Sequence, residues 1–418
     1  MKICLLGLGY IGLPTAALFA THGHEVVGTD INKNVVETIN KGITRFDEPE
    51  LSELLETAIV SENFRAKTEV EEADVFIIAV PTPLDKEMKM ADLEYVRSAA
   101  EMIYPHLRKN NLVILESTVP PGTCDKLLVP ILENSGLKAG DFRLAHCPER
   151  AIPGNTIYEM VHNDRIIGGI NKESTELAHS LYSCFVKGNF YLTNTLTAEF
   201  VKLMENTFRD INIALANEFA QIAEECGTNV WDAIELANKH PRVNVLKPGP
   251  GVGGHCIAID PWFLTENTTR CRIVSLAREI NEGMPNHVLQ IVKRQVDDIK
   301  DPVVTVFGVA YKGGVDDTRE TPALKFIKLA ANEGYTVKVY DPYVKEFEYE
   351  ILRLEDAVKD SDCIVLITDH PEFKAIDPEK ISALMRNKNV VDTRNMLDTE
   401  RWKEAEFSVK VLGMTDYE

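Results

Sequence analysis

The sequence predicts an α/β protein in which two Rossmann-like, doubly wound domains are joined by a long central helical region. Three features predict this fold class: a glycine-rich turn after the first apolar stretch, a weaker copy of that plan after residue 300, and a long helix-forming stretch between them. At 418 residues the chain is too long for one ordinary core. We therefore expect three parts, residues 1–190, 191–297 and 298–418.

Composition excludes several classes of protein. Hydrophobic residues make up 44% of the chain and charged residues 26%, which is typical of a soluble globular protein, and there is no apolar run long enough to cross a membrane. The net charge of −20 argues against a nucleic-acid binder, and it means that an anionic ligand must be held by local Lys, Arg and backbone N–H groups.

The eight cysteines are scattered without a CxxC pair, so we expect neither a zinc site nor a disulfide framework, and we expect a reducing compartment such as the cytoplasm. The first twenty residues resemble a signal peptide, because a Lys precedes apolar residues. The glycine spacing within them favours a strand and a turn instead.

The first element is an apolar strand that leads into Gly7-Leu8-Gly9-Tyr10-Ile11-Gly12, followed by a helix that should end at Gly23. A second strand ends at Asp30, 23 residues beyond Gly7, and this context turns a weak GxGxxG pattern into a dinucleotide fingerprint. Gly7 permits the tight turn, Gly9 lets the backbone approach a pyrophosphate, and Gly12 lets helix and strand pack closely. The Asp30 carboxylate should bind a ribose hydroxyl and repel a 2′-phosphate, which favours NAD over NADP, although Lys33 lies close by.

Three further strands follow the same plan, at residues 74–83, 111–123 and 142–150, and each ends in a polar, proline-containing turn. Ligands of doubly wound sheets bind outside the carboxyl ends of the strands. This rule places the following side chains near the cofactor: Thr82, Ser117, Thr118, Glu149 and Arg150. For Thr118 and Glu149, turn capping by a short polar side chain is an equally good explanation.

Residues 193–227 should form one long helix, with Asn194 or Thr195 as the N-cap and Gly227 after its last turn. Its apolar positions cover more than one stripe, which indicates burial between domains or between subunits. Lys202, Asn206 and Arg209 share one face, either as a solvated polar edge or, as we prefer, as a stripe facing an active site.

The stretch at 248–263, PGPGVGGHCIAIDPWF, places four glycines before Cys256 and an acid, Asp260, four residues after it. Glycines let such a loop approach a ligand closely. Cys256 is therefore either a reactive thiol or a small buried side chain in a flexible linker. The helical stretches around this loop, 230–240 and 271–299, suit a dimerisation element.

The last part repeats the opening plan in degraded form, with a strand at 303–308, a helix, and a second strand that ends at Asp341. Strands at 362–368 and 389–395 should extend the sheet. The first loop carries Lys312 and Arg319 in place of GxGxxG, and Arg394 falls at a strand end. These cations suit phosphate recognition, although surface basic residues on an acidic protein are the plainer explanation for any one of them.

These motifs together resemble one family, the nucleotide-sugar 6-dehydrogenases that act on UDP-glucose, GDP-mannose or UDP-N-acetylhexosamines. The resemblance covers essentially the whole chain and rests on six segments in family order: GLGYIG, STVPPGT, CPER, EFVKLMENTFRD, GPGVGGHCIAIDP and AYKGGVDDTRETP. Three stretches, KHPRVN, PGPGVGGHCIAIDPWF and CPERAIPGN, resemble the members that use UDP-N-acetyl-D-mannosamine, with UDP-N-acetylglucosamine as the alternative substrate. Ile259 stands where members that use UDP-glucose carry a Lys.

The resemblance implies a four-electron oxidation of a sugar C6 alcohol to a carboxylate, with two NAD⁺ reduced and no aldehyde released, for surface polysaccharide or other glycan precursors. It implies that Cys256 is the nucleophile, through a thiohemiacetal and a thioester. Lys202 and Asn206 would stabilise the oxyanion, and Asp260 would serve the proton transfers. A water near Thr118 and Glu149 would serve the hydrolysis.

By resemblance, residues 1–190 bind NAD, 191–297 dimerise and carry the Cys256 loop, and 298–418 bind the UDP-sugar. Together with the three glycines of the turn, the NAD site would be lined by Tyr10, Ile11, Asp30, Lys33, Thr82, Thr118 and Arg319. The sugar-nucleotide site would be lined by Arg150, Ala151, Lys202, Asn206, Arg209, His240, Arg242, Gly253, Tyr311, Lys312 and Arg394. The resemblance also implies a homodimer or a dimer-based oligomer. In it, Arg242 would serve the sugar site of its own subunit or that of the neighbouring subunit.

Two other functions fit part of the sequence. A two-electron β-hydroxyacid dehydrogenase shares the layout and a helical lysine, but it leaves the Cys256 loop and the last domain unexplained. A catalytically silent NAD-binding scaffold would require Cys256, Lys202 and Asp260 to be accidental.

Overall fold

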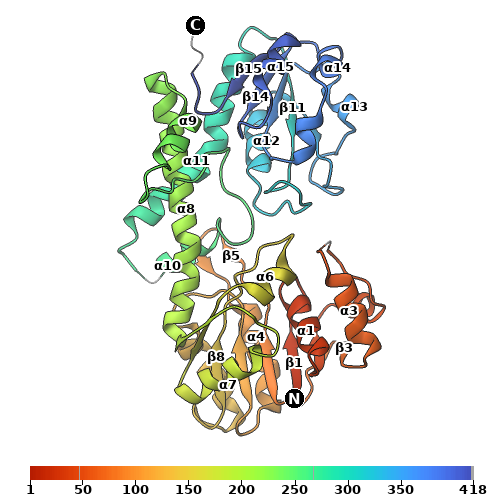
Figure 1. Ribbon diagram of the computed structural model, residues 1–418, viewed down its shortest axis with the longest axis vertical. Coiled ribbons are helices and arrows are strands. Elements are labelled where there is room, and N and C mark those ends of the chain that lie inside the picture. Colours follow the sequence, from red (N-terminus) through yellow and green to blue (C-terminus); the bar gives the residue numbers. More distant parts are fainter. Residues whose placement is uncertain (47, 267, 416–418) are drawn as a thin grey trace. The chain divides into compact units, whose positions relative to one another are not determined.

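The computed structural model describes residues 1–46, 48–266 and 268–415, and the chain divides into two compact units (Figure 1). Unit 1 comprises Met1–Glu205 and Trp262–Thr268, and unit 2 comprises Asn206–Pro261 and Thr269–Glu418. The predicted fold class is confirmed, because unit 1 contains an eight-stranded sheet, unit 2 a five-stranded one, and long helices lie between them in the chain. The division into three parts at 190 and 297 stays a prediction.

The sheet of unit 1 has the strand order β10-β9-β8-β7-β4-β1-β2-β3. Its strands are β1 (Lys2–Leu6), β2 (Glu25–Thr29), β3 (Phe64–Lys67), β4 (Val75–Ile78), β7 (Leu112–Leu115), β8 (Arg143–His146), β9 (Arg165–Gly169) and β10 (Phe190–Asn194). The six strands from β3 to β8 are all parallel and follow the 3-2-1-4-5-6 order of dinucleotide-binding sheets. β9 pairs antiparallel with β8 and parallel with β10.

The strands predicted at 74–83, 111–123 and 142–150 exist but are shorter, ending at residues 78, 115 and 146. Prolines follow each of them at 81, 120 and 148. Proline has no N–H to donate to a ladder, so the polar residues that follow lie in loops at the carboxyl edge of the sheet.

Both faces of this sheet are covered, and β1 is therefore buried on both sides. Ile3 and Leu5 pack into one hydrophobic cluster, whereas Cys4 and Leu6 pack into another. The helices are α1 (Gly12–Thr21), α2 (Lys33–Asn40), α3 (Leu51–Val60), α4 (Glu94–Ile103), α5 (Val129–Leu132), α6 (Thr156–His162) and α7 (Lys172–Tyr182). A two-stranded hairpin, β5 (Leu84–Asp85) with β6 (Met90–Ala91), precedes α4.

The predicted long helix is α8, Thr195–Cys226 (Figure 1). Its caps are those expected: Asn194 Oδ1 accepts the Thr197 N–H at 2.8 Å, and Gly227 has a φ of +73°. Three helices follow it, α9 (Val230–Ala237), α10 (Asp260–Thr265) and α11 (Arg272–Gln295). Their positions place the Cys256 loop between α9 and α10.

The sheet of unit 2 is entirely parallel, with the order β12-β11-β13-β14-β15. The strands are β11 (Val303–Phe307), β12 (Thr336–Tyr340), β13 (Cys363–Leu366), β14 (Asn389–Asp392) and β15 (Ser408–Val411), and the helices are α12 (Pro322–Asn332), α13 (Leu354–Val358), α14 (Pro378–Ser382) and α15 (Thr399–Glu404). This is the predicted second nucleotide-type domain, and α11 packs against it through α12 (Figure 1).

Across the described ranges, every helix is either too short or too polar to cross a lipid bilayer.

Candidate active site

The glycine turn of unit 1 has a different constraint at each glycine. Gly7 has a φ of +97°, and a Cβ there would lie 2.5 Å from the Ala79 carbonyl oxygen. A Cβ on Gly12 would lie 1.8 Å from the Gly7 oxygen, so α1 can pack this closely only with glycine. A Cβ on Gly9 would meet no protein atom within 4 Å. The open side of Gly9, at the N-terminus of α1, fits a pyrophosphate.

Asp30 lies at the end of β2, beside this turn. Its Oδ2 accepts the Leu8 N–H at 3.1 Å, and its Oδ1 accepts the Asn32 N–H at 2.9 Å. A carboxylate has about four lone-pair positions, so acceptor capacity remains for a ribose hydroxyl. Lys33 is exposed at the first residue of α2.

The other predicted cofactor residues of unit 1 border the same edge of the sheet. Thr82 Oγ1 donates to the Thr118 carbonyl at 2.8 Å and joins the loops after β4 and β7, while Ser117 Oγ donates to the Val80 carbonyl at 2.7 Å. Ile11 is the N-cap residue of α1. Tyr10 stacks on Phe46 with ring centroids 4.2 Å apart, a partner that the sequence did not single out.

Glu149 is a buried carboxylate with three donors. Its Oε1 accepts the N–H groups of Arg150 and Ala151 at 2.7 and 2.9 Å, and its Oε2 accepts Arg165 Nη2 at 2.7 Å. Arg165, on β9, is almost fully buried, and its pKa is raised above its ordinary value because Glu149 and other anionic groups outweigh burial. The pair fixes both oxygens of Glu149 and leaves capacity to hold a water.

A second buried acid, Glu116, belongs to the same cluster. It accepts hydrogen bonds from Thr15 Oγ1 and from the Tyr182 hydroxyl, and the Arg165 guanidinium lies 4.8 Å from the Tyr182 ring. Burial raises the pKa of Glu116 to about 7, although Arg165 acts in the opposite direction. Neither Arg165 nor Glu116 belongs to one of the sequence motifs, so the sequence alone does not indicate either residue.

Arg150 is already paired within unit 1. Its Nη2 lies 2.7 Å from Glu205 Oε1 on α8, its Nε donates to the other oxygen, and its Nη1 donates to the Asp164 carbonyl. Lys202, one turn earlier on α8, is buried. Burial lowers the pKa of His146 to about 3, and the Lys202 charge acts in the same direction. His146 is therefore neutral beside Lys202.

The loop after β7 is held by another acid that the sequence did not indicate. Glu199 on α8 is buried, and its two oxygens accept the N–H groups of Gly122 and Cys124 at 2.5 and 2.8 Å. Burial raises its pKa, and these two hydrogen bonds lower it. The loop that carries Ser117 and Thr118 is thereby fastened to α8.

In unit 2 the Cys256 loop is pressed against the nucleotide-type domain, which explains its glycines. A Cβ on Gly254, whose φ is +86°, would lie 2.8 Å from the Tyr311 ring, and a Cβ on Gly253 would lie 2.7 Å from the Glu320 carbonyl oxygen. A Cβ on Gly249 would lie 2.7 Å from Arg394 Nη1. The predicted residues Tyr311 and Arg394 are therefore brought to the Cys256 loop.

Cys256 itself is exposed on a turn. Its carbonyl accepts the N–H groups of Ile259 and Asp260, at 3.1 and 2.8 Å. The pKa of the neighbouring His255 is lowered by burial and by the Arg319 charge, which favours a neutral imidazole. An exposed thiol on a braced turn is the arrangement that covalent chemistry requires.

Asp260 and Asn206 meet in unit 2, because Asn206 Nδ2 donates to Asp260 Oδ2 at 2.6 Å and both side chains are buried. Arg209, which shares the helix face with Asn206 by spacing, is exposed. His240 and Arg242 lie in an exposed turn after α9, where His240 Nδ1 accepts the Arg242 N–H.

The three cations predicted in residues 298–418 differ in their surroundings. Arg319 is held by both oxygens of Asp317, with its Nε 2.8 and 3.0 Å from them. Arg394 Nε donates to the Ile367 carbonyl, and burial lowers its pKa while Asp369 and Asp392 act in the opposite direction. Lys312 is exposed in the loop after β11.

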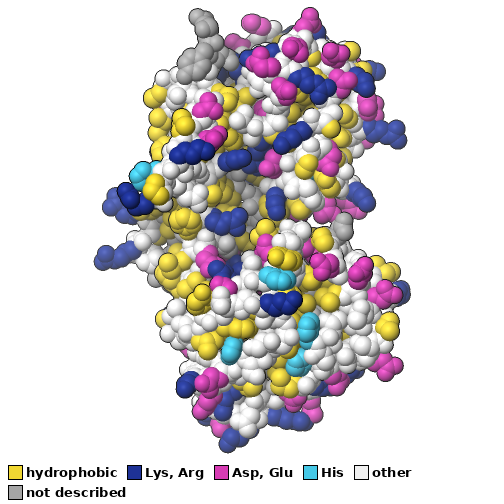
Figure 2. Space-filling view, viewed as in Figure 1, with side chains coloured by type: hydrophobic (Ala, Val, Ile, Leu, Met, Phe, Trp, Pro, Cys, Tyr) yellow, Lys and Arg dark blue, Asp and Glu magenta, His cyan; other side chains and the backbone are white. Residues whose placement is uncertain are grey.

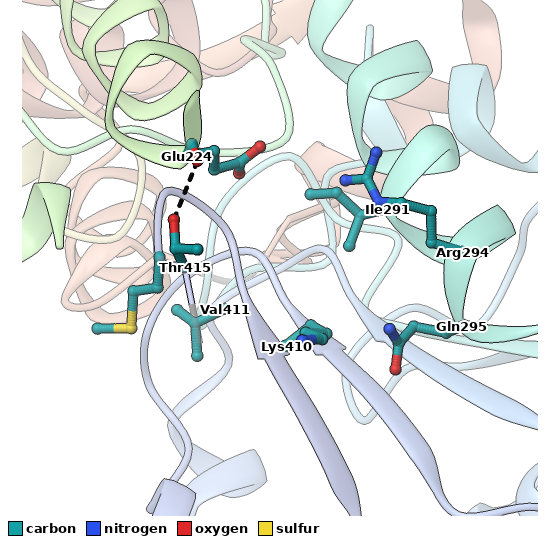
Figure 3. A pocket seen from close by; sticks show the side chains of 8 residues that line it. Glu224, Ile291, Arg294, Gln295, Lys410, Val411 and Thr415 are labelled. Atoms are coloured by element: carbon teal, nitrogen blue, oxygen red, sulfur yellow. Dashed lines mark hydrogen bonds between the residues drawn. The ribbon is translucent and has the colours of Figure 1, made fainter. Parts of the chain in front are cut away.

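A cavity of about 410 Å³ lies elsewhere in unit 2 (Figure 3). Its lining consists of Glu224, Ile291, Arg294, Gln295, Lys410, Val411, Met414 and Thr415, where the Thr415 hydroxyl donates to the Glu224 carbonyl. This lining contains none of the predicted site residues, so the cavity is separate from the candidate site among the residues that the structure describes.

Three models of one family match the chain in order. The NAD binding domain of the UDP-glucose/GDP-mannose dehydrogenase family matches residues 1–186, its central domain matches residues 196–283, and its UDP binding domain matches residues 305–399.

Relatives match along nearly the whole length. The chain is 51% identical over 420 residues to the UDP-N-acetyl-D-mannosamine dehydrogenase of Methanococcus vannielii, covering 99% of this chain and 97% of that protein. The UDP-D-ManNAc dehydrogenase structure from Pyrococcus horikoshii matches with a TM-score of 0.94 and 45% identity, covering all of both chains. The UDP-N-acetyl-mannosamine dehydrogenase structure from Staphylococcus aureus matches with a TM-score of 0.90 and 42% identity, over 99% of this chain and 98% of that one.

Proposed function

The chain belongs to the UDP-glucose/GDP-mannose dehydrogenase family, and from this premise we propose that it oxidises UDP-N-acetyl-D-mannosamine at C6 to the uronate with two NAD⁺. The observation that carries the choice of sugar is the full-length similarity to UDP-N-acetyl-D-mannosamine dehydrogenases at about half identity. The glycine turn, with Gly9 open and Asp30 at the end of β2, fits the NAD that the family binds.

The need for a cysteine follows from the balance of the reaction. NAD⁺ accepts one hydride in each of two steps, and the aldehyde formed in the first step must gain a bond to a heteroatom before it can lose a second hydride. The Cys256 thiolate adds to the aldehyde, which gives a thiohemiacetal. Loss of the second hydride leaves a thioester, which water cleaves to carboxylate and free thiol. One alcohol, two NAD⁺ and one water thus give one carboxylate, two NADH and three protons.

The remaining residues are assigned by their chemistry. Lys202 stabilises the oxyanions of the alkoxide and of the thiohemiacetal, and Asn206 is a neutral donor beside it. Asp260, oriented by its hydrogen bond from Asn206, moves protons to and from Cys256 and its adducts. Glu149, with both oxygens held, accepts a hydrogen bond from the hydrolytic water near Thr118.

The sugar-nucleotide site follows the family resemblance and is lined by Arg150, Ala151, Lys202, Asn206, Arg209, His240, Arg242, Gly253, Tyr311, Lys312 and Arg394. The cations among them suit its phosphates, since the net charge of −20 requires local cations for an anionic substrate. Arg319 contributes to the NAD site.

Counting NADH tests the reaction. Wild-type protein given UDP-N-acetyl-D-mannosamine and excess NAD⁺ should form two NADH per sugar, more efficiently than with UDP-N-acetylglucosamine or UDP-glucose. Cys256→Ala should form no uronate yet bind NAD with wild-type affinity, because Cys256 and the glycine turn lie in different units. One NADH with free aldehyde from the wild type would contradict the four-electron reaction, and full turnover by Cys256→Ala would make the cysteine structural.

We also propose a homodimer through α8. Large apolar side chains recur along this helix and remain exposed in the single chain: Leu196, Phe200, Met204, Phe208, Leu215, Phe219 and Ile222. Figure 2 shows hydrophobic side chains over the region that α8 and α9 occupy in Figure 1. A surface of this kind marks a protein interface, and two copies of one helix can cover each other symmetrically. We place the enzyme in the cytoplasm, where eight thiols stay reduced and glycan precursors can be made.

A further inference from the structure

The loop after β11, residues 308–314, carries Tyr311 and Lys312, and we call it the nucleotide loop. It lies tightly against the end of β13. Gly308 has a φ of +85°, and a Cβ there would lie 2.4 Å from Thr368 Cβ. A Cβ on Gly313 would lie 2.2 Å from the Asp369 carbonyl oxygen. The residues that follow β13 therefore form the wall against which this loop folds.

Asp341 directly follows β12, just as Asp30 directly follows β2 in unit 1, but its hydrogen bonding is different. Its Oδ2 accepts the Val309 and Ala310 N–H groups at 2.7 and 3.2 Å, and it also accepts His370 Nε2 at 3.0 Å. Its Oδ1 accepts two more backbone N–H groups, at 2.8 and 2.9 Å. Five donors consume the capacity that Asp30 keeps for a ribose, so Asp341 holds the nucleotide loop and binds no ribose.

His370 connects Asp341 to the other end of the loop. It is fully buried, and its Nδ1 lies 3.1 Å from the Gly314 nitrogen. A backbone N–H can only donate, so Nδ1 is the acceptor and the proton resides on Nε2, facing Asp341. Stacking on Tyr343, with centroids 5.0 Å apart, and an edge contact with Phe373 fix the plane of the imidazole.

Two neighbours of His370 bind the same loop. Thr368 Oγ1 donates to the Ala310 carbonyl at 2.6 Å, and Asp369 Oδ1 accepts the Gly313 N–H at 3.1 Å. Residues 368–370 thus contact the nucleotide loop at three consecutive positions, which we call the loop clamp. Its contacts flank Tyr311 and Lys312 on both sides.

The nucleotide loop in turn supports the Cys256 loop. Added Cβ atoms on Gly253 and Gly254 would lie 3.0 Å from Tyr311 Cβ and 2.8 Å from its ring. The Gly254 N–H also donates to the Arg319 carbonyl at 2.9 Å. Because Cys256 follows two residues later, a shift of Tyr311 moves the support on which the Cys256 turn rests.

We propose that His370 is a positioning residue that, through the loop clamp, sets the nucleotide loop and with it the Cys256 loop. His370 does not itself contact the Cys256 thiol or the sugar carbon. It couples binding of a nucleoside diphosphate to the placement of the thiol. The ligand side of this proposal rests on the proposed function, whereas the effect on Cys256 does not.

The test uses the full chain and two variants of the loop clamp. His370→Phe keeps the ring but removes both hydrogen bonds, and Thr368→Val removes one hydroxyl at nearly constant shape, which covers the case that the first variant fails to fold. Thr305→Val is the matched control, because its buried hydroxyl on β11 bonds to the Ala357 carbonyl of α13 and to Ser361 Oγ without touching the loop. His370→Asn, which keeps an acceptor near the Nδ1 position, should recover part of any loss.

Three quantities are measured: the affinity for UDP by calorimetry, the alkylation rate of Cys256 by iodoacetamide followed on its peptide by mass spectrometry, and the affinity for NAD. We expect both clamp variants to weaken UDP binding about tenfold and to change the Cys256 alkylation rate at least about threefold, with NAD affinity unchanged. In turnover, KM for the sugar nucleotide should rise more than kcat falls.

The proposal is overturned if the clamp variants match Thr305→Val in both UDP affinity and Cys256 alkylation. Failure of the wild type to bind UDP would contradict the proposed function instead, and the alkylation rates would then decide the positioning role by themselves.

Discussion

At the scale of single residues, the three glycines of the first turn show how far local reasoning reaches. Gly7 needs a positive φ, Gly12 needs close packing and Gly9 borders open space, and each constraint depends on a few neighbouring backbone atoms. The GxGxxG spacing therefore predicts all three. The glycines of the Cys256 loop are different, because Gly253 and Gly254 are required by Glu320 and Tyr311, which lie far along the chain.

Asp30→Ala should raise KM for NAD⁺ about 10- to 100-fold, because a hydrogen bond to a charged acceptor contributes about 1.5–3 kcal/mol. The same change removes the repulsion of a 2′-phosphate, so the preference for NAD⁺ over NADP⁺ should shrink. Steady-state kinetics with both dinucleotides measures this. Asp30→Asn, which still accepts the Leu8 N–H, separates the charge from the turn contact. An unchanged ratio between the dinucleotides would contradict the assignment.

Glu116 makes stability depend on pH. Its pKa in the folded protein is about 7, above its ordinary 4.5, so its contribution is fully present below pH 4.5 and is lost as pH rises through 7. Glu116→Gln removes this dependence. Relative to wild type, the variant should therefore gain up to about 3 kcal/mol in free energy of unfolding between pH 5 and pH 8. Denaturant titrations of both proteins at each pH measure the difference in their free energies of unfolding. A difference that stays constant with pH would show that Glu116 ionises normally.

At the scale of elements, α8 combines two kinds of information. Its ends were predicted from Asn194 and Gly227, which act locally. Its apolar side chains predicted burial between domains or subunits, and the structure leaves a row of them exposed in the single chain. The helix itself therefore follows from local signals, whereas what covers its exposed apolar side chains is a matter for the proposed dimer.

Phe208→Asp should separate the proposed dimer. Phe208 is 63% exposed in the single chain, and in a symmetric interface the charge is buried twice. We expect the dimer dissociation constant to rise at least about 30-fold, as for the loss of an interface hot spot. Light scattering after gel filtration measures the mass. Val60→Asp, at an apolar position on α3 that is 75% exposed, is the control and should leave the mass unchanged. A dimeric Phe208→Asp protein would place the interface elsewhere.

At the scale of the whole molecule, each unit has its own hydrophobic cores. Two clusters cover the faces of the unit 1 sheet, and two others lie in unit 2. Stability should accordingly be divided between the units.

Phe326→Ala and Phe19→Ala test this division, because both rings are fully buried, the first on α12 and the second on α1. Each truncation should cost its own unit about 3–5 kcal/mol. We expect Phe326→Ala to weaken UDP binding and leave NAD affinity within about twofold, and Phe19→Ala to do the reverse. Calorimetric titration with each ligand below the unfolding temperature measures both. Equal losses of both affinities in either variant would mean that the units unfold as one.

The sequence by itself determined the fold class, the presence of one sheet before and one after the helical stretch, the glycine turn and the stretch that carries Cys256. Strand and helix periodicities and turn residues act over a few neighbours, so they can be read locally. Tertiary structure alone decided which buried groups hold these parts in place. Glu199 binds an N–H 77 residues away, Arg165 binds Glu149, and His370 joins Asp341 to the nucleotide loop. A buried charge or imidazole is tolerated only with its particular partners, and those partners become neighbours only when the chain has folded.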